Sequence, residues 1–375
     1  MNCKYFGECG SCTIFENGYS AQFQSKKKLV SEKFLDLFQG KFDEFQSPEQ
    51  NYRYRVEFKI WHKAEKIYYA MRGVEKNKIV LIDNCPMASQ PIYDLMQPLL
   101  FEIKNNILLS KKLFSIEFLS SLAGDIIVTL IYHKKLSEIG ENWDLEATKL
   151  QHKFNISIIG RSRKEKRVLK KDFIDEVLKV GNSEYKFKYF ENSFSQPNPI
   201  VNRKMVKWIS DNVEKIENRK DLIELYCGSG NFTIPLSKQF QKVLATEISK
   251  SGIISAIENR DENGVENIDF IRVSSEEFTD AIDKKRKFFR LKDIDLDSFA
   301  LTTIFIDPPR AGLDEKSIKL VQRFDNILYI SCNPETFHRD LEILTKTHQI
   351  QKMAIFDQFP YTHHLEMGVI LGLIK

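Results

Sequence analysis

Residues 221–232 read DLIELYCGSGNF, and this stretch decides the fold class of the carboxyl-terminal half of the chain. Its apolar part predicts a strand, its glycines predict a tight turn, and a helix over 231–239 follows. Gly228 and Gly230 allow the backbone to bend sharply and approach a ligand, and a helix start offers free N–H groups. Thr233 stands where a dinucleotide fingerprint has its third glycine, which argues against a bound pyrophosphate.

The strand predicted after this turn ends in an acidic residue. Glu247 lies 17 residues beyond Gly230, a position from which a carboxylate can bind both hydroxyls of a ribose. The glycine turn and Glu247 together favour an adenosyl ligand without a diphosphate, such as S-adenosylmethionine.

Strand and helix patterns alternate along the chain from about residue 185 onward. This alternation predicts an α/β fold with a Rossmann-like, doubly wound and mostly parallel sheet. Upstream, alternating strands and a hairpin over 114–132 stand between helical stretches, which predicts an α+β domain. We therefore expect two domains, residues 1–185 and residues 186–375, and the second is expected to bind the adenosyl ligand.

The loop Asp307-Pro308-Pro309-Arg310 follows another predicted strand. Its two prolines stiffen the backbone, so the loop can hold a flat base at low entropic cost. Arg310 can bind a base carbonyl or a phosphate.

A thiol and a carboxylate follow in the last part of the chain. Cys332 lies between a predicted strand, 325–330, and Pro334, which suits the first turn of a helix. The helix start is expected to lower the pKa of the thiol, which predicts a nucleophile, and the alternative is a buried core cysteine. Glu366, 34 residues later, is the candidate base, and the alternative is an ordinary surface glutamate.

Four further cysteines, Cys3, Cys9, Cys12 and Cys85, have a ligand-like spacing. Soft thiolates suit an iron–sulfur cluster or zinc, and the third alternative is no metal. No apolar run approaches the ~18 residues needed to span a bilayer, and the first residues lack a signal peptide. We therefore expect a cytoplasmic protein without membrane contact, whose thiols stay reduced.

The formal net charge is only +4, but the run 161–171 carries seven Lys or Arg residues against the single acid Glu165. Such a run favours a polyanion as partner, and a solvated surface is the alternative.

Several motifs together resemble one known family over nearly the whole chain. They read YRYRVEFKIWH, KLFSIEFL and LIYHKK in the amino half, and ENSFSQPN, ELYCGSGNF, IDPPR, YISCNPET and FDQFPYTHHLEMGV in the carboxyl half. These motifs are similar to those of the tRNA (uracil-5-)-methyltransferase branch of the RNA 5-methyluridine methyltransferases.

The resemblance implies an enzyme that transfers a methyl group from S-adenosylmethionine to C5 of a specific uridine in the tRNA T-loop. Cys332 matches the nucleophile that adds to C6 of uracil, and Glu366 matches the general base. The residues that match S-adenosylmethionine contacts are Gln196, Tyr226, Asn231, Glu247 and Asp307, beside Gly228 and Gly230 of the turn.

The resemblance also implies that the amino-terminal domain, residues 1–185, recognises RNA. The residues expected to contact it are Arg53, Arg55, Lys59, Phe114, His133 and Arg310. Phe114 is a candidate for stacking on an extruded base, and core packing is the alternative. The expected partner is the T-arm of tRNA, with no obligate protein partner evident.

In similar RNA 5-methyluridine methyltransferases a comparable cysteine set holds a [4Fe–4S] cluster, which many members of the tRNA branch lack. Cluster-bearing relatives often modify ribosomal RNA, so the same chemistry on a ribosomal RNA uridine is the second hypothesis. A non-catalytic RNA-binding protein is the third, and the presence of both Cys332 and Glu366 argues against it.

Overall fold

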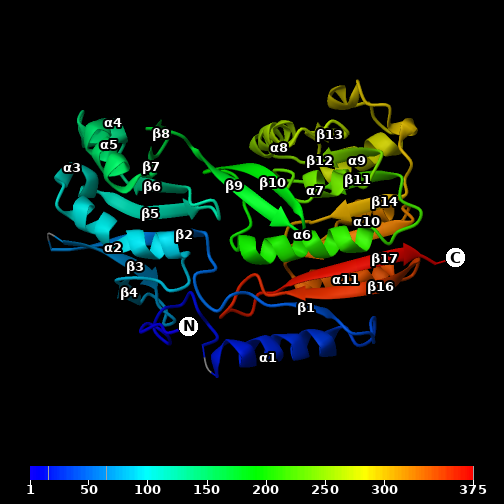
Figure 1. Cartoon of the computed structure of the whole chain (residues 1–375), viewed down its shortest axis with the longest axis horizontal. Coiled ribbons are helices and arrows are strands. Elements are labelled where there is room, and N and C mark those ends of the chain that lie inside the picture. Colours follow the sequence, from blue (N-terminus) through cyan, green and yellow to red (C-terminus); the bar gives the residue numbers. More distant parts are fainter. Residues whose placement is uncertain (16, 65, 375) are drawn as a thin grey trace.

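The structure is a computed structural model that describes residues 1–15, 17–64 and 66–374 (Figure 1). Within these residues, eight strands form one sheet in the carboxyl-terminal part. They follow one another in space as β1 (Asp43–Phe45), β16 (His348–Phe356), β17 (Glu366–Leu373), β15 (Asn326–Ser331), β14 (Thr303–Ile306), β11 (Asp221–Leu225), β12 (Lys242–Thr246) and β13 (Ile268–Ile271). Neighbours are parallel except around β17, which is antiparallel to both β15 and β16.

Helices cover both faces of this sheet, which confirms the doubly wound prediction. One face packs against α6 (Pro199–Val213), α7 (Thr233–Ser237) and α8 (Lys250–Glu262). The other face packs against α1 (Gly18–Lys33), α9 (Ser275–Ile282), α10 (Glu315–Val321) and α11 (Pro334–Leu344). Burial on both faces explains why strands such as β14 and β15 are almost continuously apolar in sequence.

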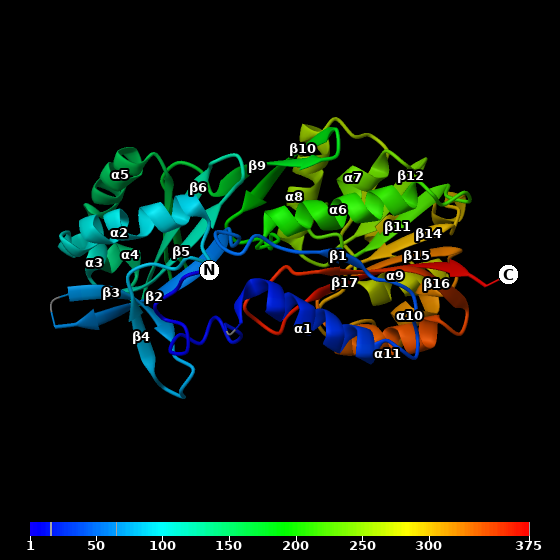
Figure 2. The ribbon, with the colours of Figure 1, turned by 60° about the horizontal axis from the view of Figure 1, so that its bottom comes forward.

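A second sheet, of seven strands in the described part of the chain, forms the amino-terminal region (Figure 2). Its order is β4 (Ile79–Ile82), β3 (Lys66–Arg72), β2 (Arg55–Lys63), β5 (Leu113–Ser120), β6 (Ile126–Tyr132), β7 (Ser157–Ser162) and β8 (Glu165–Val168). The pairs are antiparallel except β6 with β7. Its core also contains residues of α2 (Gln90–Lys104), α3 (Ile107–Ser110), α4 (Leu136–Ile139) and α5 (Trp143–Phe154).

A separate hairpin, β9 (Phe173–Val180) with β10 (Ser183–Phe190), joins the two regions. Its Leu178 and Phe187 are buried in the same core as α6 and α8, so the hairpin packs with the carboxyl-terminal sheet. The proposed division of the chain at residue 185 falls inside β10.

The beginning of the chain also packs with the carboxyl-terminal sheet. Phe23 and Val30 of α1 are buried in the core that contains α10 and α11, and β1 pairs with β16. The chain therefore contributes a helix and an edge strand to the larger sheet before it builds the smaller one.

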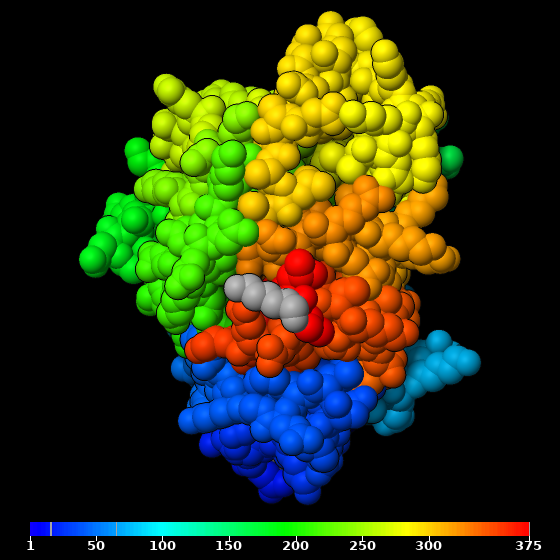
Figure 3. All heavy atoms as spheres, turned by 90° about the vertical axis from the view of Figure 1, so that its right-hand side faces the viewer, coloured from blue at the N-terminus to red at the C-terminus, as the bar shows by residue number. Residues whose placement is uncertain are grey.

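Between α9 and β14 lie two short 3-10 helices, η1 (Phe289–Leu291) and η2 (Leu296–Ser298). This segment belongs to the yellow projection in the space-filling view (Figure 3). In the part of the chain that the structure describes, no helix combines the length and apolar content required to cross a membrane.

Candidate active site

The carboxyl ends of the central parallel strands meet at one edge of the larger sheet, where ligands bind in open α/β sheets. Tyr226 follows β11, Glu247 follows β12, Asp307 follows β14 and Cys332 follows β15. Four residues from separate motifs are thus brought together by the topology of the sheet.

The glycine turn after β11 is held in a left-handed backbone conformation. Tyr226, Gly228 and Gly230 have φ angles of 64°, 55° and 83°. A Cβ at Gly228 would meet no other atom within 4 Å, whereas a Cβ at Gly230 would come within 3.2 Å of Phe270. Gly228 therefore leaves open space for a ligand, and Gly230 permits close packing.

Both carboxylate oxygens of Glu247 accept backbone hydrogen bonds, and one of these bonds comes from the glycine turn. The backbone N–H of Gly228 donates to Oε2 at 3.1 Å, and that of Ser249 donates to Oε1 at 2.7 Å. Asn259 Nδ2 donates to the carbonyl of Ser229 at 3.0 Å. The turn and the carboxylate are thereby one rigid unit. The following helix, α7, begins at Thr233, two residues later than predicted.

Asn231 is fixed by a reciprocal amide pair. Its Nδ2 donates to Asn202 Oδ1 at 2.9 Å, and Asn202 Nδ2 donates to Asn231 Oδ1 at 2.7 Å. The hydroxyl of Tyr189 donates to the same Oδ1 at 3.4 Å. Sequence reasoning did not identify Asn202, because only the folded chain places α6 beside the glycine turn.

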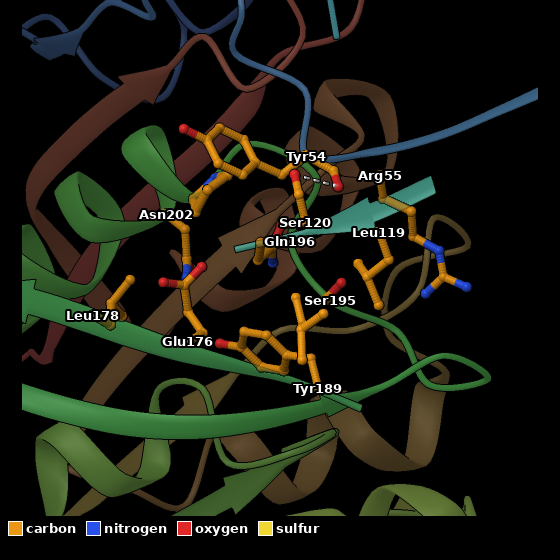
Figure 4. A pocket seen from close by; sticks show the side chains of 12 residues that line it. Tyr54, Arg55, Leu119, Ser120, Glu176, Leu178, Tyr189, Ser195, Gln196 and Asn202 are labelled. Atoms are coloured by element: carbon orange, nitrogen blue, oxygen red, sulfur yellow. Dashed lines mark hydrogen bonds between the residues drawn. The ribbon is translucent and has the colours of Figure 1, made fainter. Parts of the chain in front are cut away.

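A pocket lies at the junction of the two regions (Figure 4). Its lining comes from the start of β2 with the residue before it, the end of β5, the hairpin, the segment before α6 and α6 itself: Tyr54, Arg55, Leu119, Ser120, Ile174, Glu176, Leu178, Tyr189, Ser195, Gln196, Pro199 and Asn202. Burial raises the pKa of Glu176 to about 7, although the N–H groups of Leu122 and Val177 favour its charged form. Gln196 accepts a hydrogen bond from Gln358 Nε2 at 2.7 Å.

Cys332 and Glu366 stand at adjacent strand ends. In the antiparallel pair of β15 with β17, Ser331 lies opposite Met367. Cys332 directly follows Ser331, and Glu366 directly precedes Met367, so both lie at the same edge of the sheet. Pro334 begins α11, as predicted, and the side chain of Asn333 caps this helix by accepting from the N–H of Glu335 at 3.1 Å.

The pKa of the Cys332 thiol is raised to about 11, mainly by burial and then by the charges of Glu366 and Asp307. The prediction of a lowered pKa for this thiol is therefore wrong. Two carboxylates and partial desolvation outweigh both the backbone N–H groups and the guanidinium of Arg310, which lowers the pKa.

The carboxyl groups at this edge also bind protons unusually strongly. The pKa of Glu366 is raised to about 8, mainly by burial and then by the charge of Asp307, while Arg310 opposes the increase. Burial raises the pKa of Asp307 to about 7 and that of Glu224 to about 8. Glu224 Oε2 has no hydrogen-bond partner among the described residues. The sequence signal that could have identified Glu224 is an acid between the apolar residues Ile223 and Leu225 of a predicted strand.

The loop that carries Arg310 is fixed by α11. Its carbonyl accepts from Asn333 Nδ2 at 2.9 Å and from Thr336 Oγ1 at 3.1 Å. The exposed guanidinium lies 3.4 Å from His364 Nδ1. Arg310 thus stands beside the segment that leads to Glu366.

Three of the residues expected to contact RNA form one exposed cluster on the amino-terminal sheet. The ring centroids of Phe114 and His133 are 4.2 Å apart, and Lys59 Nζ lies 4.1 Å from the centroid of Phe114. The register of β5 against β6 shifts between Leu113 and Ser115, so Phe114 lies in a bulge. Such a bulge re-aims a side chain, and Phe114 is only partly buried.

Arg55 instead makes contacts within the protein. It pairs with Glu117 at 2.6 Å and donates to the carbonyls of Glu191 and Ser193 at 2.6 Å each. Arg53 Nε donates to the carbonyl of Arg55 at 3.1 Å. Arg55 therefore ties the smaller sheet to the segment that carries Gln196.

Four of the seven basic residues in the run 161–171 form ion pairs in the fold. Arg161 pairs with Glu191 at 2.7 Å, and Arg167 pairs with Asp144 at 3.2 Å. Further pairs join Lys166 to Asp172 and Lys171 to Asp175. This arrangement favours the alternative of a solvated, ion-paired surface.

The four amino-terminal cysteines gather in one neighbourhood. The pKa of Cys12 is raised to about 12, mainly by burial and then by the charges of Cys85, Cys9 and Cys3. Within the described ranges, however, no group of three or more His, Cys, Asp or Glu side chains is arranged to hold a metal ion. The thiols are near one another without forming a coordination geometry.

The sheet order, the glycine turn and the acidic strand end define a Rossmann-like methyltransferase that uses S-adenosylmethionine. Among solved structures, the Pyrococcus abyssi tRNA (uracil-54, C5)-methyltransferase in complex with S-adenosyl-L-homocysteine shares the fold. Its TM-score is 0.71 at 22% identity, over 97% of this chain and 86% of that chain.

The chain belongs to the tRNA (uracil-5-)-methyltransferase family, whose model matches residues 18–374. It is 50% identical to the tRNA/tmRNA (uracil-C(5))-methyltransferase of Sulfurimonas denitrificans over 99% of each chain. It is also 50% identical to the enzyme of the same description from Aliarcobacter butzleri over 100% of each chain. The family confirms that this protein is an enzyme.

Proposed function

We propose that this enzyme methylates C5 of a uridine in the T-loop of tRNA, with Cys332 as nucleophile and Glu366 as general base. The observation that carries the proposal is the position of Cys332 and Glu366 at adjacent strand ends, beside the glycine turn and Asp307. Family membership and the tRNA/tmRNA description of the 50% identical relatives support tRNA as the substrate.

The proposed chemistry begins with activation of the pyrimidine, because C5 of uracil alone is too poor a nucleophile. The thiolate of Cys332 forms a bond to C6, and the C5=C6 electrons move to give an enolate. C5 then bonds to the methyl carbon, and the electrons of the broken S–CH₃ bond remain on the donor sulfur. Glu366 removes the C5 proton, the double bond re-forms and the Cys332 thiolate leaves.

The residues proposed to hold the methyl donor surround the glycine turn. Glu247 is aimed by its two backbone N–H contacts and would bind the ribose hydroxyls. Open space above Gly228 supports a ligand at this point. The other proposed contacts are Gln196, Tyr226, Gly230, Asn231 and Asp307. The donor supplies an electrophilic methyl group when bound.

The uridine must leave its stack before Cys332 can reach it. The exposed cluster of Phe114, His133 and Lys59 would bind RNA by stacking and by contact with phosphate. We propose that Arg310, beside the thiol, binds the base or its phosphate.

We also propose that Cys3, Cys9, Cys12 and Cys85 hold a [4Fe–4S] cluster with a structural role. Thiolate donors suit such a cluster, and their mutual proximity supports the set. No catalytic step is assigned to it. A cytoplasmic location, where thiols stay reduced, belongs to the same proposal.

The test is a methylation assay with mapped products. Purified enzyme and isotopically labelled methyl donor are incubated with a tRNA transcript, with the same transcript carrying cytidine at the T-loop target, and with ribosomal RNA. We expect 5-methyluridine in the T-loop of the first substrate and none in the second. Methylation of ribosomal RNA with unmodified tRNA would overturn the proposed substrate.

A further inference from the structure

A short loop leads directly into the proposed base. Residues 357–365 connect the end of β16 to the start of β17, and Phe356 and Glu366 are cross-strand partners. The loop therefore leaves and re-enters the sheet at one point. The conformation of this loop therefore determines the position of Glu366 at the sheet edge.

Lys26 of α1 binds both ends of this loop. Its Nζ donates to Asp357 Oδ1 at 2.7 Å, to the carbonyl of Phe359 at 2.9 Å and to the carbonyl of His364 at 3.1 Å. An ammonium group has three donors, so these contacts use all of them. Asp357 is the first residue of the loop, and His364 lies two residues before Glu366.

This contact is buried and therefore costly. Lys26 is 5% exposed and Asp357 is fully buried. Burial lowers the pKa of Lys26, and the Asp357 carboxylate opposes that change. A buried ion pair contributes little net stability over apolar residues of similar size, whereas it can specify one geometry. The three-way contact is better explained by a positioning role than by stability.

The centre of the loop is held by neighbouring residues. The N–H of Tyr361 donates to Gln22 Oε1 at 2.6 Å, one turn before Lys26 on the same face of α1. The N–H groups of Thr13 and Ile14 donate to the carbonyl of Tyr361 at 2.8 and 3.0 Å. Figures 1 and 2 both show the red loop beside the start of α1.

We infer that Lys26 is a positioning residue that holds Glu366 in place for removal of the C5 proton. This inference rests on the proposed function, which makes Glu366 the base. Lys26 touches neither the thiol nor the base, so its loss should act on the step that Glu366 performs. Bond formation by Cys332 should be affected much less, because β15 and α11 hold that residue independently.

The experiment uses the double variant Lys26→Met/Asp357→Asn, which removes the contacts to the carbonyls without leaving a buried unpaired charge. The control is Lys28→Met, on the exposed side of the same helix. Reactions with tRNA are quenched over time, and the covalent protein–RNA adduct and released 5-methyluridine are measured separately. We expect release to slow about 10- to 100-fold with accumulation of adduct, and the control to match the unaltered enzyme.

Equal loss of adduct formation and release, or no change in either, would overturn the inference. Should the double variant fail to fold, Lys26→Arg retains the charge while altering the donor geometry. The rates of adduct formation and of 5-methyluridine release in this variant then test the inference. The variant Glu366→Gln distinguishes a failure of the proposed function from a failure of the positioning role alone. If it accumulates no adduct, the proposed function fails. If it does and the Lys26 variants do not, only the positioning role fails.

Discussion

The carboxyl group of Glu366 raises the pKa of the Cys332 thiol, because the two residues stand at adjacent ends of β15 and β17. Negative charge on both at once is disfavoured. When the sulfur bonds to C6 of the base, its charge leaves the pair and the repulsion ends. This relationship favours an order in which the thiol reacts first and Glu366 serves as base afterwards.

Replacement of the thiol should abolish methylation without affecting the fold of the donor site. In Cys332→Ala no bond to C6 can form, so C5 remains unreactive. We expect no detectable methyl transfer from labelled donor to tRNA. The affinity for S-adenosylmethionine, measured by calorimetry, should stay within about threefold of that of the unaltered enzyme, because distant sites act nearly independently. Retained turnover would remove Cys332 from the mechanism.

Replacement of the base should instead trap the intermediate. An amide at position 366 cannot accept the C5 proton, so the adduct forms but its elimination is blocked. We expect Glu366→Gln with tRNA and donor to yield a slowly migrating protein–RNA species on a denaturing gel. The double variant with Cys332→Ala is the control and should lack this species. Rapid product release by Glu366→Gln would place the base elsewhere.

The reaction should accelerate with rising pH. Cys332 and Glu366 both act in their deprotonated forms, and their pKa values are raised to about 11 and about 8. Arg310 lowers the pKa of both groups, so Arg310→Leu should move the increase in single-turnover rate to higher pH. The exposed variant Lys319→Met is the control. A profile that is unchanged, or moved to lower pH, would contradict this electrostatic role.

Several features of the candidate site are encoded by residues that are close together in the sequence. The strand ends that carry Glu247, Asp307 and Cys332 were predictable, because apolar runs and turn residues mark them directly. The pKa of Cys332 was not, because it depends on Glu366 and Asp307, which only the sheet order brings beside the thiol. Local signals at a helix start were outweighed by distant charges.

The packing partners of β1 and of the β9–β10 hairpin could not be predicted from the sequence either. Strand β1 is only three residues long, and nothing near it indicates its parallel partner β16. The hairpin β9–β10 alternates clearly, but its choice of core is set by α6 and α8. The bulge at Phe114 likewise reverses what simple alternation predicts, which is a side chain in the core.

The folded protein should become less stable as pH rises, because a buried carboxyl group holds a proton that the unfolded chain has already released. Glu224 is 1% exposed, and its pKa is raised from 4.5 to about 8. Between these values the folded state binds more protons than the unfolded state, so the free energy of unfolding falls with pH. The slope is about 1.4 kcal/mol per pH unit for each such proton.

Glu224→Gln removes this titration, so the pH dependence between pH 5.5 and 7.5 should become flatter by about that amount. Urea unfolding at several pH values measures the slope. The exposed variant Glu276→Gln of α9 is the matched control. A slope identical to that of the unaltered enzyme would mean that Glu224 is charged in the folded state.

The cysteine set can be tested by metal content. Protein purified without oxygen should be brown and contain about four irons per chain. Cys12→Ser should lose this iron and lower the thermal midpoint, because Cys12 immediately precedes Thr13 and Ile14, whose N–H groups hold the carbonyl of Tyr361. Cys227→Ser, in the core of the other region, is the control and should keep its iron. Colourless, iron-free protein in which a thiol reagent modifies Cys3, Cys9, Cys12 and Cys85 would show that these residues hold no cluster.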